Sequence, residues 1–301
     1  MYTAHFGLRE LPFGITPDTS FFFACTSYQE ALNTLVIAAK NGEGFIKITG
    51  EVGTGKTLLC RKFMATLDDS FVTAYIPNPQ LEPRALVMAV ADELEIKLDK
   101  DVDQHQLFKA INLRLLHLAR DNKRVLLCID EAQAMPIESL EALRLLTNLE
   151  TEKRKLLQIV MFGQPELDAK LQDNAIRQLN QRIVFHYRLA PLTRDDMAFY
   201  LSHRLNIAGF SGGRLFRPGA MRALHQASGG FPRLINILAH KSLMLAYGEG
   251  SHDIGARHVR AAARDTGAAK ARGWAWPRWL AAGTAVLLLA ACGGLGWMSL
   301  K

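Results

Sequence analysis

Eight consecutive residues decide the fold of this chain: Gly50-Glu51-Val52-Gly53-Thr54-Gly55-Lys56-Thr57. They satisfy the pattern G-x-x-x-x-G-K-[S/T] at every defined position, between a predicted strand at 45–49 and a predicted helix at 58–67. Glycines in such a loop let successive backbone N–H groups point at phosphates, and the N-terminus of the following helix adds a favourable dipole. We therefore predict a P-loop whose eight residues all bind ATP. Lys56, which we also count as catalytic, should reach the β- and γ-phosphates, and Thr57 should bind Mg²⁺.

The second half of the predicted site follows a buried strand. Residues 125–129 form a continuous apolar run, which is typical of a central strand in a parallel sheet. Directly after it come Asp130, a candidate for the acid associated with Mg²⁺, and Glu131, placed to orient or deprotonate the attacking water. Two adjacent acids at a strand end also occur in ordinary solvated turns. The P-loop upstream favours the catalytic interpretation, and Glu131 favours hydrolysis over binding alone.

Strands and helices alternate around these motifs, which predicts an α/β fold with a parallel, helix-covered sheet. The expected strands are 45–49, 71–76, 125–129, 156–162 and 183–189. From residue 193 onward only helical patterns remain, at 193–208, 218–228, 231–246 and 255–265. We predict a P-loop domain at 1–190, an all-α lid at 191–266, a basic tether at 267–278 and a transmembrane helix at 279–300.

The charge distribution supports that last assignment. The chain of 301 residues carries a formal net charge of +7, and the stretch 257–278 holds six basic residues and one acidic residue, hence +5. The positive charge is therefore concentrated beside the most hydrophobic segment, which favours a membrane over a DNA-binding face.

Residues 279–300 are 22 residues without a charge, long enough as a helix (about 33 Å) to cross a bilayer. A buried helix of a soluble domain is the alternative. The basic residues precede this segment, so the positive-inside rule predicts a single-pass protein of the inner membrane with residues 1–278 in the cytoplasm. No signal peptide is expected at the N-terminus.

Other site types receive no support. The four cysteines are scattered without a C-x-x-C pair, and the nine histidines include no pair at metal-ligand spacing with supporting acids. We therefore expect neither a disulfide framework nor a zinc site.

With these residues in hand, the chain resembles AAA+ ATPases of the general secretion pathway protein A (ExeA) type, over about residues 1–266. Within that family it is most similar to the group serving biogenesis of the mannose-sensitive haemagglutinin (MSHA) type IV pilus. The residues that carry the resemblance, besides the P-loop, are Phe6-Gly7-Leu8, Pro12-Phe13, Pro17-Asp18, Gly44-Phe45, Asp130-Glu131-Ala132-Gln133, Gly163-Gln164-Pro165-Glu166-Leu167 and Gly230-Phe231-Pro232-Arg233. Larger members of the family continue past their membrane helix into a periplasmic peptidoglycan-binding domain, whereas this sequence stops at Lys301. We therefore expect no direct cell-wall role for it.

The resemblance implies three further site residues. Gln164, just past a predicted strand, resembles the sensor-1 position, which meets the γ-phosphate or the water; a polar loop residue without a role is the alternative. Arg233, at the start of a lid helix, resembles sensor 2, which contacts the phosphates; the alternative is a solvated arginine. Arg182 resembles the arginine finger presented to a neighbouring subunit, with Arg177 as second choice. A finger acting in trans implies a homo-oligomer.

The function expected from this combination is a membrane-anchored ATPase that supports assembly of a type IV (MSHA-like) pilus or a type II secretion apparatus. Its partners would be inner-membrane assembly proteins and the lipid bilayer. The alternative is a DNA-associated AAA+ ATPase of the transposition or origin type. That alternative predicts a DNA-binding module after the lid, where this sequence has its apolar segment, so nucleic acid is not the expected partner.

Overall fold

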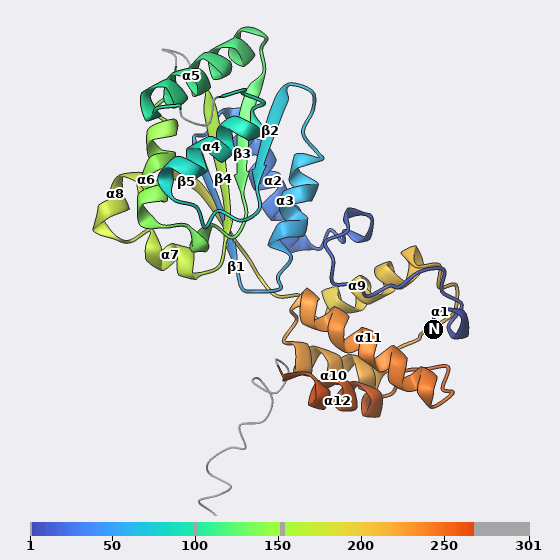
Figure 1. The fold of residues 1–301 in the computed structure, drawn as a ribbon. Coiled ribbons are helices and arrows are strands. Elements are labelled where there is room, and N and C mark those ends of the chain that lie inside the picture. Colours follow the sequence, from blue (N-terminus) through green and yellow to red (C-terminus); the bar gives the residue numbers. More distant parts are fainter. Residues whose placement is uncertain (1, 99–101, 151–153, 268–301) are drawn as a thin grey trace, which may run out of the picture.

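The computed structural model describes residues 2–98, 102–150 and 154–267. Its centre is a five-stranded sheet with the order β2-β3-β4-β1-β5, in which every neighbouring pair is parallel (Figure 1). The strands are β1 (Phe45–Gly50), β2 (Phe71–Ile76), β3 (Arg124–Ile129), β4 (Leu157–Gly163) and β5 (Ile183–Leu189). The prediction of a parallel α/β sheet is confirmed.

Strand β3 is apolar from Val125 to Ile129 because both faces of the sheet are covered. In β3, Leu126 and Cys128 belong to the core on one face, whereas Leu127 and Ile129 belong to the core on the other. Successive side chains of a strand point to opposite faces, so a continuous apolar run fills both cores.

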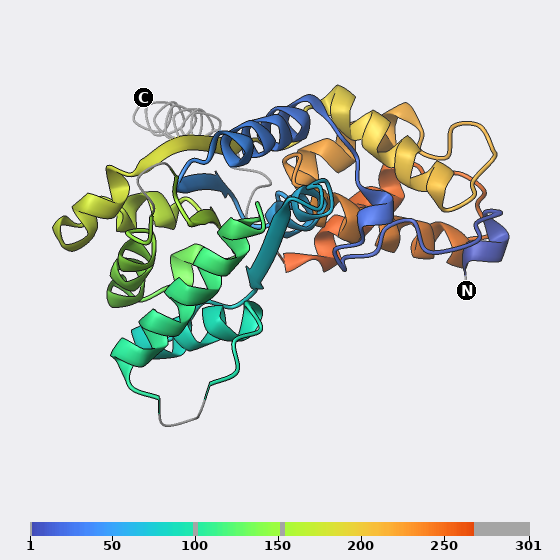
Figure 2. The same ribbon diagram turned by 90° about the horizontal axis from the view of Figure 1, so that it is seen from above.

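Two sets of helices supply the other halves of these cores. The first face is covered by α2 (Thr26–Asn41) and α3 (Lys56–Met64). The second face is covered by α4 (Pro83–Glu93), α5 (Gln104–Arg120) and α6 (Ile137–Leu146). Figure 2 shows this layering from above, with blue α2 on one side of the sheet and the green and teal α5 and α4 on the other.

After β5 the described chain is helical. The lid consists of α9 (Arg194–Ile207), α10 (Pro218–Ser228), α11 (Pro232–Gly248) and α12 (Ala256–Asp265). Its buried residues continue the core on the first face of the sheet. The short N-terminal helix α1 (Tyr2–His5) lies on α11, where the hydroxyl of Tyr2 is 2.8 Å from Nδ1 of His240.

Local residues explain where two helices begin or end. Helix α3 begins at Lys56, two residues earlier than expected, because Gly55 is its N-cap in the left-handed conformation. Helix α6 begins after Pro136 and ends at Leu146, with Thr147 as its C-cap.

None of the helices within 2–98, 102–150 and 154–267 combines the length and apolarity that a membrane crossing requires. The predicted transmembrane helix at 279–300, and the predicted tether beyond Gly267, lie outside the described residues.

Candidate functional site: a phosphate-binding loop at the carboxyl edge of the sheet

The loop at the end of β1 takes backbone angles that need glycine at two positions. Gly53 and Gly55 have φ of +82° and +87°, in the left-handed region that residues with a Cβ rarely adopt. A Cβ on Gly53 would also lie 2.9 Å from Cβ of Arg233, so a larger residue would push the lid away. Gly53 therefore serves both the shape of the loop and its close approach to α11, whereas Gly55 lies against Tyr28 of α2.

Lys56 is turned back onto this loop. Its Nζ donates hydrogen bonds to the carbonyl oxygens of Gly50, at 2.8 Å, and Glu51, at 3.2 Å. Burial lowers the pKa of Lys56, while the charges of Glu131 and Asp130 act in the opposite direction. Phosphate oxygens entering the loop would replace two neutral acceptors with charged ones, which favours the ammonium form.

Thr57 and Asp130, the two residues predicted to bind Mg²⁺, are in direct contact. The Thr57 hydroxyl donates to Oδ2 of Asp130 at 2.6 Å, joining the start of α3 to the end of β3. Burial raises the pKa of Asp130, and the hydrogen bond from Thr57 offsets part of that effect. Hydroxyl and carboxylate oxygens suit Mg²⁺, which takes most of its remaining ligands from phosphates and water. The described residues include no cluster of three or more His, Cys, Asp or Glu side chains able to hold a metal by themselves.

Glu131 is held by two amides. Its Oε2 accepts hydrogen bonds from Nε2 of Gln133 at 2.5 Å and from Nε2 of Gln164 at 3.1 Å. Burial on its own would raise the pKa of Glu131, but these hydrogen bonds and the charge of Lys56 outweigh it and leave the pKa below its usual value. Glu131 has φ of +51°, a left-handed conformation that is uncommon for a residue other than glycine. Strained backbone of this kind occurs where neighbouring contacts enforce it.

Gln133 was not recognised as a site residue in the sequence. Besides contacting Glu131, its Oε1 accepts a hydrogen bond at 3.0 Å from the backbone N–H of Gln164. It therefore links the ends of the neighbouring strands β3 and β4. The sequence shows Gln133 within the run Asp130-Glu131-Ala132-Gln133. It does not show that the partner of Gln133 lies at the end of β4.

Arg233 lies where the lid meets the loop. Its backbone N–H donates to the carbonyl oxygen of Gly53 at 3.2 Å, and its side chain is exposed and lines the cavity above the loop. Gly53, Lys56, Thr57, Glu131 and Arg233 thus surround one cavity.

The same cavity extends away from the loop between the N-terminal segment and the lid. Its lining there includes residues 14–18, together with Tyr200 and Arg204 of α9 and Asn236 of α11. The three lid side chains are buried, with exposed fractions of 5–6%. The sequence did not predict that these three residues line the cavity. Each is a polar residue within a helix and belongs to no recognisable motif. The phenylalanines between residues 13 and 23 lie in two different places. Phe13 and Phe21 are buried in the core, and Phe23 lines the cavity.

The two candidate arginine fingers lie outside this cavity in their own chain. Arg182 is half-buried and donates to Oγ1 of Thr147 at 3.2 Å and to the carbonyl oxygen of Arg144 at 3.5 Å. Arg177, in the short helix α8 (Arg177–Asn180), is exposed. Of the two, Arg177 is therefore the more accessible to a neighbouring subunit.

Comparison with known proteins agrees with this site. A family model described as an AAA domain matches residues 39–171, which include the P-loop and the Asp130-Glu131 pair. General secretion pathway protein A of Aeromonas hydrophila is 41% identical over 297 residues, covering 99% of this chain and 54% of that protein. The chain thus spans about half the length of this relative.

Solved structures show the same fold at low identity. Cdc6p of Pyrobaculum aerophilum has a TM-score of 0.64 and 21% identity, covering 82% of this chain and 70% of its own. Drosophila ORC, solved bound to DNA, has a TM-score of 0.62 and 16% identity, covering 83% and 65%. The RuvB Holliday junction branch migration motor of Thermotoga maritima has a TM-score of 0.53 and 15% identity, covering 80% and 69%. Identities this low show the fold alone.

Proposed function

Since this chain belongs to the AAA+ ATPase family of general secretion pathway protein A, we propose that it binds ATP with Mg²⁺ and hydrolyses it as part of a membrane-bound assembly machine. The machine would build a type IV (MSHA-like) pilus or a type II secretion apparatus. The observation that carries the ATPase proposal is the 2.6 Å contact between Thr57 and Asp130, with Glu131 directly beside it.

Each residue of the site has a distinct task in this proposal. The loop N–H groups and Lys56 hold the phosphates, for which Lys56 must release the carbonyl oxygens of Gly50 and Glu51. Thr57 and Asp130 hold the ion that neutralises charge developing on the phosphates. Glu131, which its hydrogen bonds keep ionised, orients or deprotonates the water.

The two polar residues around Glu131 and the lid arginine complete the constellation. Gln164 donates to Glu131, the residue that would act on the water, and this contact supports a sensor-1 role. Arg233 adds a positive charge from the lid at the mouth of the cavity, as expected of sensor 2. An arginine of a neighbouring subunit, Arg177 or Arg182, would complete the site, so the active form would be a homo-oligomer.

Attachment to the inner membrane is the second part of the proposal. Its support is the uncharged stretch at 279–300 with its basic flank, together with the membership of this chain in a secretion-pathway family. The ATPase domain would face the cytoplasm, where ATP is available, and its partners would be inner-membrane assembly proteins.

The Glu131→Gln variant tests the catalytic part. The amide keeps the size of the side chain and removes the charge, so labelled ATP should still bind with Mg²⁺ while phosphate release falls about 100-fold or more. Unchanged phosphate release would refute the role of Glu131. The same variant should remain ATP-bound, so a pull-down from detergent-solubilised membranes should retain the assembly partners.

A DNA-associated ATPase is the alternative, because fold relatives include a protein solved on DNA. A salt-dependent gel shift with the full-length protein would support that alternative.

A further inference from the structure

Helix α12 presents a regular row of arginines to the outside of the lid. Val259 and Ala262 are buried against α10 and α11, whereas Arg257, Arg260 and Arg264 are exposed. Their spacing of three and four residues places them on one side of the helix. We call these three residues the arginine face. Figure 1 shows α12 as the outermost layer of the lid, on the side away from the sheet.

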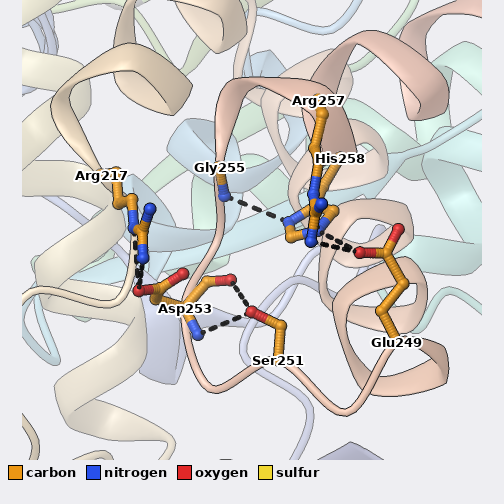
Figure 3. A network of polar contacts seen from close by, with 7 residues as sticks. All are labelled: Arg217, Glu249, Ser251, Asp253, Gly255, Arg257 and His258. Carbon is orange, nitrogen blue, oxygen red and sulfur yellow. Dashed lines mark hydrogen bonds and ion pairs between the residues drawn. The ribbon is translucent and has the colours of Figure 1, made fainter.

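A polar network fixes the first turn of this helix (Figure 3). His258 is buried, its Nδ1 accepts from the backbone N–H of Gly255 at 3.1 Å, and its Nε2 lies 3.0 Å from Oε2 of Glu249. The same Nε2 also lies 3.2 Å from Nε of Arg257. Arg257 pairs with the same carboxylate oxygen at 2.6 Å. The network therefore anchors one end of the arginine face and neutralises Arg257.

The other two arginines of the face have no such partner. Within the described part of the chain, neither Arg260 nor Arg264 forms an ion pair or a hydrogen bond from its side chain. The acid nearest in sequence, Asp265, is paired with Lys241 at 2.7 Å. Two positive charges one helical turn apart are thus without a partner among the described residues.

Exposed apolar side chains lie beside this row. Lys241 of α11 pairs with Asp265 at one end of α12, and Glu249 pairs with Arg257 at the other. Leu245 is one helical turn from each of these two α11 residues, so it lies on the stripe of α11 that borders α12. Leu245 is 39% exposed and its neighbour Met244 is 53% exposed. Cationic and apolar groups side by side are typical of surfaces that lie on a membrane interface.

We propose that the arginine face, with Leu245 and Met244, docks on the anionic headgroups of a bilayer. This proposal rests on the membrane attachment proposed above. Thirteen residues separate Asp265 from Trp279, where the uncharged stretch begins, so α12 could lie at most about 45 Å from the point of insertion. Within that distance the row of arginines meets negative lipid, to which each basic side chain adds about fivefold in binding.

Docking would orient the ATPase on the membrane. The lid also lines the nucleotide cavity through Arg233 and Asn236. If the lid is held at the bilayer, the P-loop domain would be the part that moves relative to the membrane when nucleotide enters the cavity.

Chemical labelling of arginine tests the proposal on the full chain. The protein is placed in nanodiscs of phosphatidylcholine alone, or of phosphatidylcholine with phosphatidylglycerol, and treated with phenylglyoxal, and labelled peptides are quantified by mass spectrometry. Labelling of Arg260 and Arg264 should slow about tenfold or more in the anionic discs only, and high salt should reverse the effect. Arg120, exposed at the end of α5, is the internal control and should be labelled equally in both.

Variants with matched charge changes provide the second measurement. Arg260→Glu with Arg264→Glu should make labelling of Arg257 the same in both kinds of disc. Lys109→Glu with Arg120→Glu, on α5 far from the lid, should leave the lipid-dependent protection of Arg260 and Arg264 intact.

Equal labelling of Arg260 and Arg264 in the two kinds of disc would overturn the proposal. Protection by an added oligonucleotide in place of anionic lipid would also overturn it, in favour of a nucleic-acid surface. If the chain enters neither disc, the anchor itself is refuted. Labelling of the free protein with phosphatidylglycerol vesicles would then decide the docking surface separately.

Discussion

Asn236 donates a hydrogen bond to the carbonyl oxygen of Gly14 at 3.0 Å, although the two are 222 positions apart in sequence. This contact joins lid helix α11 to the N-terminal segment, and both residues line the nucleotide cavity. Arg204 of α9 makes a parallel contact, with Nε donating to the carbonyl oxygen of Pro12 at 2.5 Å. The side of the cavity away from the P-loop is thus built jointly by the lid and the N-terminal segment.

The hydroxyl of Tyr200 joins these two contacts. It donates to Oδ1 of Asn236 at 2.8 Å and accepts from Nη1 of Arg204 at 3.2 Å. The Tyr200→Phe variant keeps the ring and removes these hydrogen bonds, each of which contributes on the order of 1 kcal/mol. We expect the affinity for ATP to fall about fivefold to tenfold. Affinity for inorganic tripolyphosphate, which needs only the loop side, should be unchanged.

Equilibrium binding of the two ligands by calorimetry measures this difference. Lys56→Ala is the control and should weaken both ligands, because the lysine acts on the phosphates. An equal loss of affinity for ATP and for tripolyphosphate in Tyr200→Phe would contradict this prediction. It would show that the Tyr200 hydroxyl does not act specifically on the side of the cavity away from the P-loop.

The amides around Glu131 provide a second prediction. In Gln164→Ala, Glu131 loses one of the two side-chain donors that orient its carboxylate. Turnover should fall about 100-fold with ATP affinity nearly unchanged, because the carboxylate acts on the water and not on the bound phosphates. Gln133→Ala should have a similar effect. Gln172→Ala, at an exposed position, is the control for steady-state phosphate release. Normal turnover in both Gln164→Ala and Gln133→Ala would contradict this role.

The two candidate arginine fingers can be separated by stability and turnover. Arg182→Ala removes contacts with Thr147 and Arg144, so its melting temperature should fall by about 2–4 °C per kcal/mol lost. Arg177→Ala should melt normally, because its side chain is exposed. Although the sequence favours Arg182, this exposure leads us to expect the larger loss of turnover, about 1000-fold, in Arg177→Ala.

Mixing subunits checks whether either arginine acts in trans. Glu131→Gln subunits cannot hydrolyse ATP but keep both arginines, so adding them to a finger-deficient variant should restore turnover. Rescue of Arg182→Ala and not of Arg177→Ala would reverse our assignment, and rescue of neither would argue against a finger in trans at these positions.

A half-buried histidine, His240, should make the free energy of unfolding depend on pH. Burial lowers the pKa of His240 from its ordinary value of 6.5. As the pH falls through 6.5, the unfolded chain takes up a proton that the folded protein resists, so the free energy of unfolding decreases toward acid.

Urea denaturation at a series of pH values between about 7.5 and 5.5 measures this dependence. His240→Gln should give a shallower loss of stability over that window, even if it lowers stability at pH 7.5 through the lost contact with Tyr2. His117→Gln, at an exposed position of α5, is the matched control. Identical slopes for His240→Gln and the unmodified protein would contradict the prediction.

The sequence by itself determined the elements and the type of site, because these depend on local patterns. Strands β2 and β5 and helix α10 have the predicted bounds, since apolar spacing, turn residues and an initial proline act within a few residues. The P-loop was equally readable, since its glycines and lysine are consecutive.

The tertiary structure alone decided how the site residues hold one another. Gln164 reaches Glu131 because β3 and β4 are neighbours in the sheet. Asn236 reaches Gly14 because the lid folds back over the N-terminal segment. Such contacts join polar side chains whose local sequence would suit any exposed turn or helix. Their partners are set by sheet order and helix packing, which bring together residues that no local pattern relates.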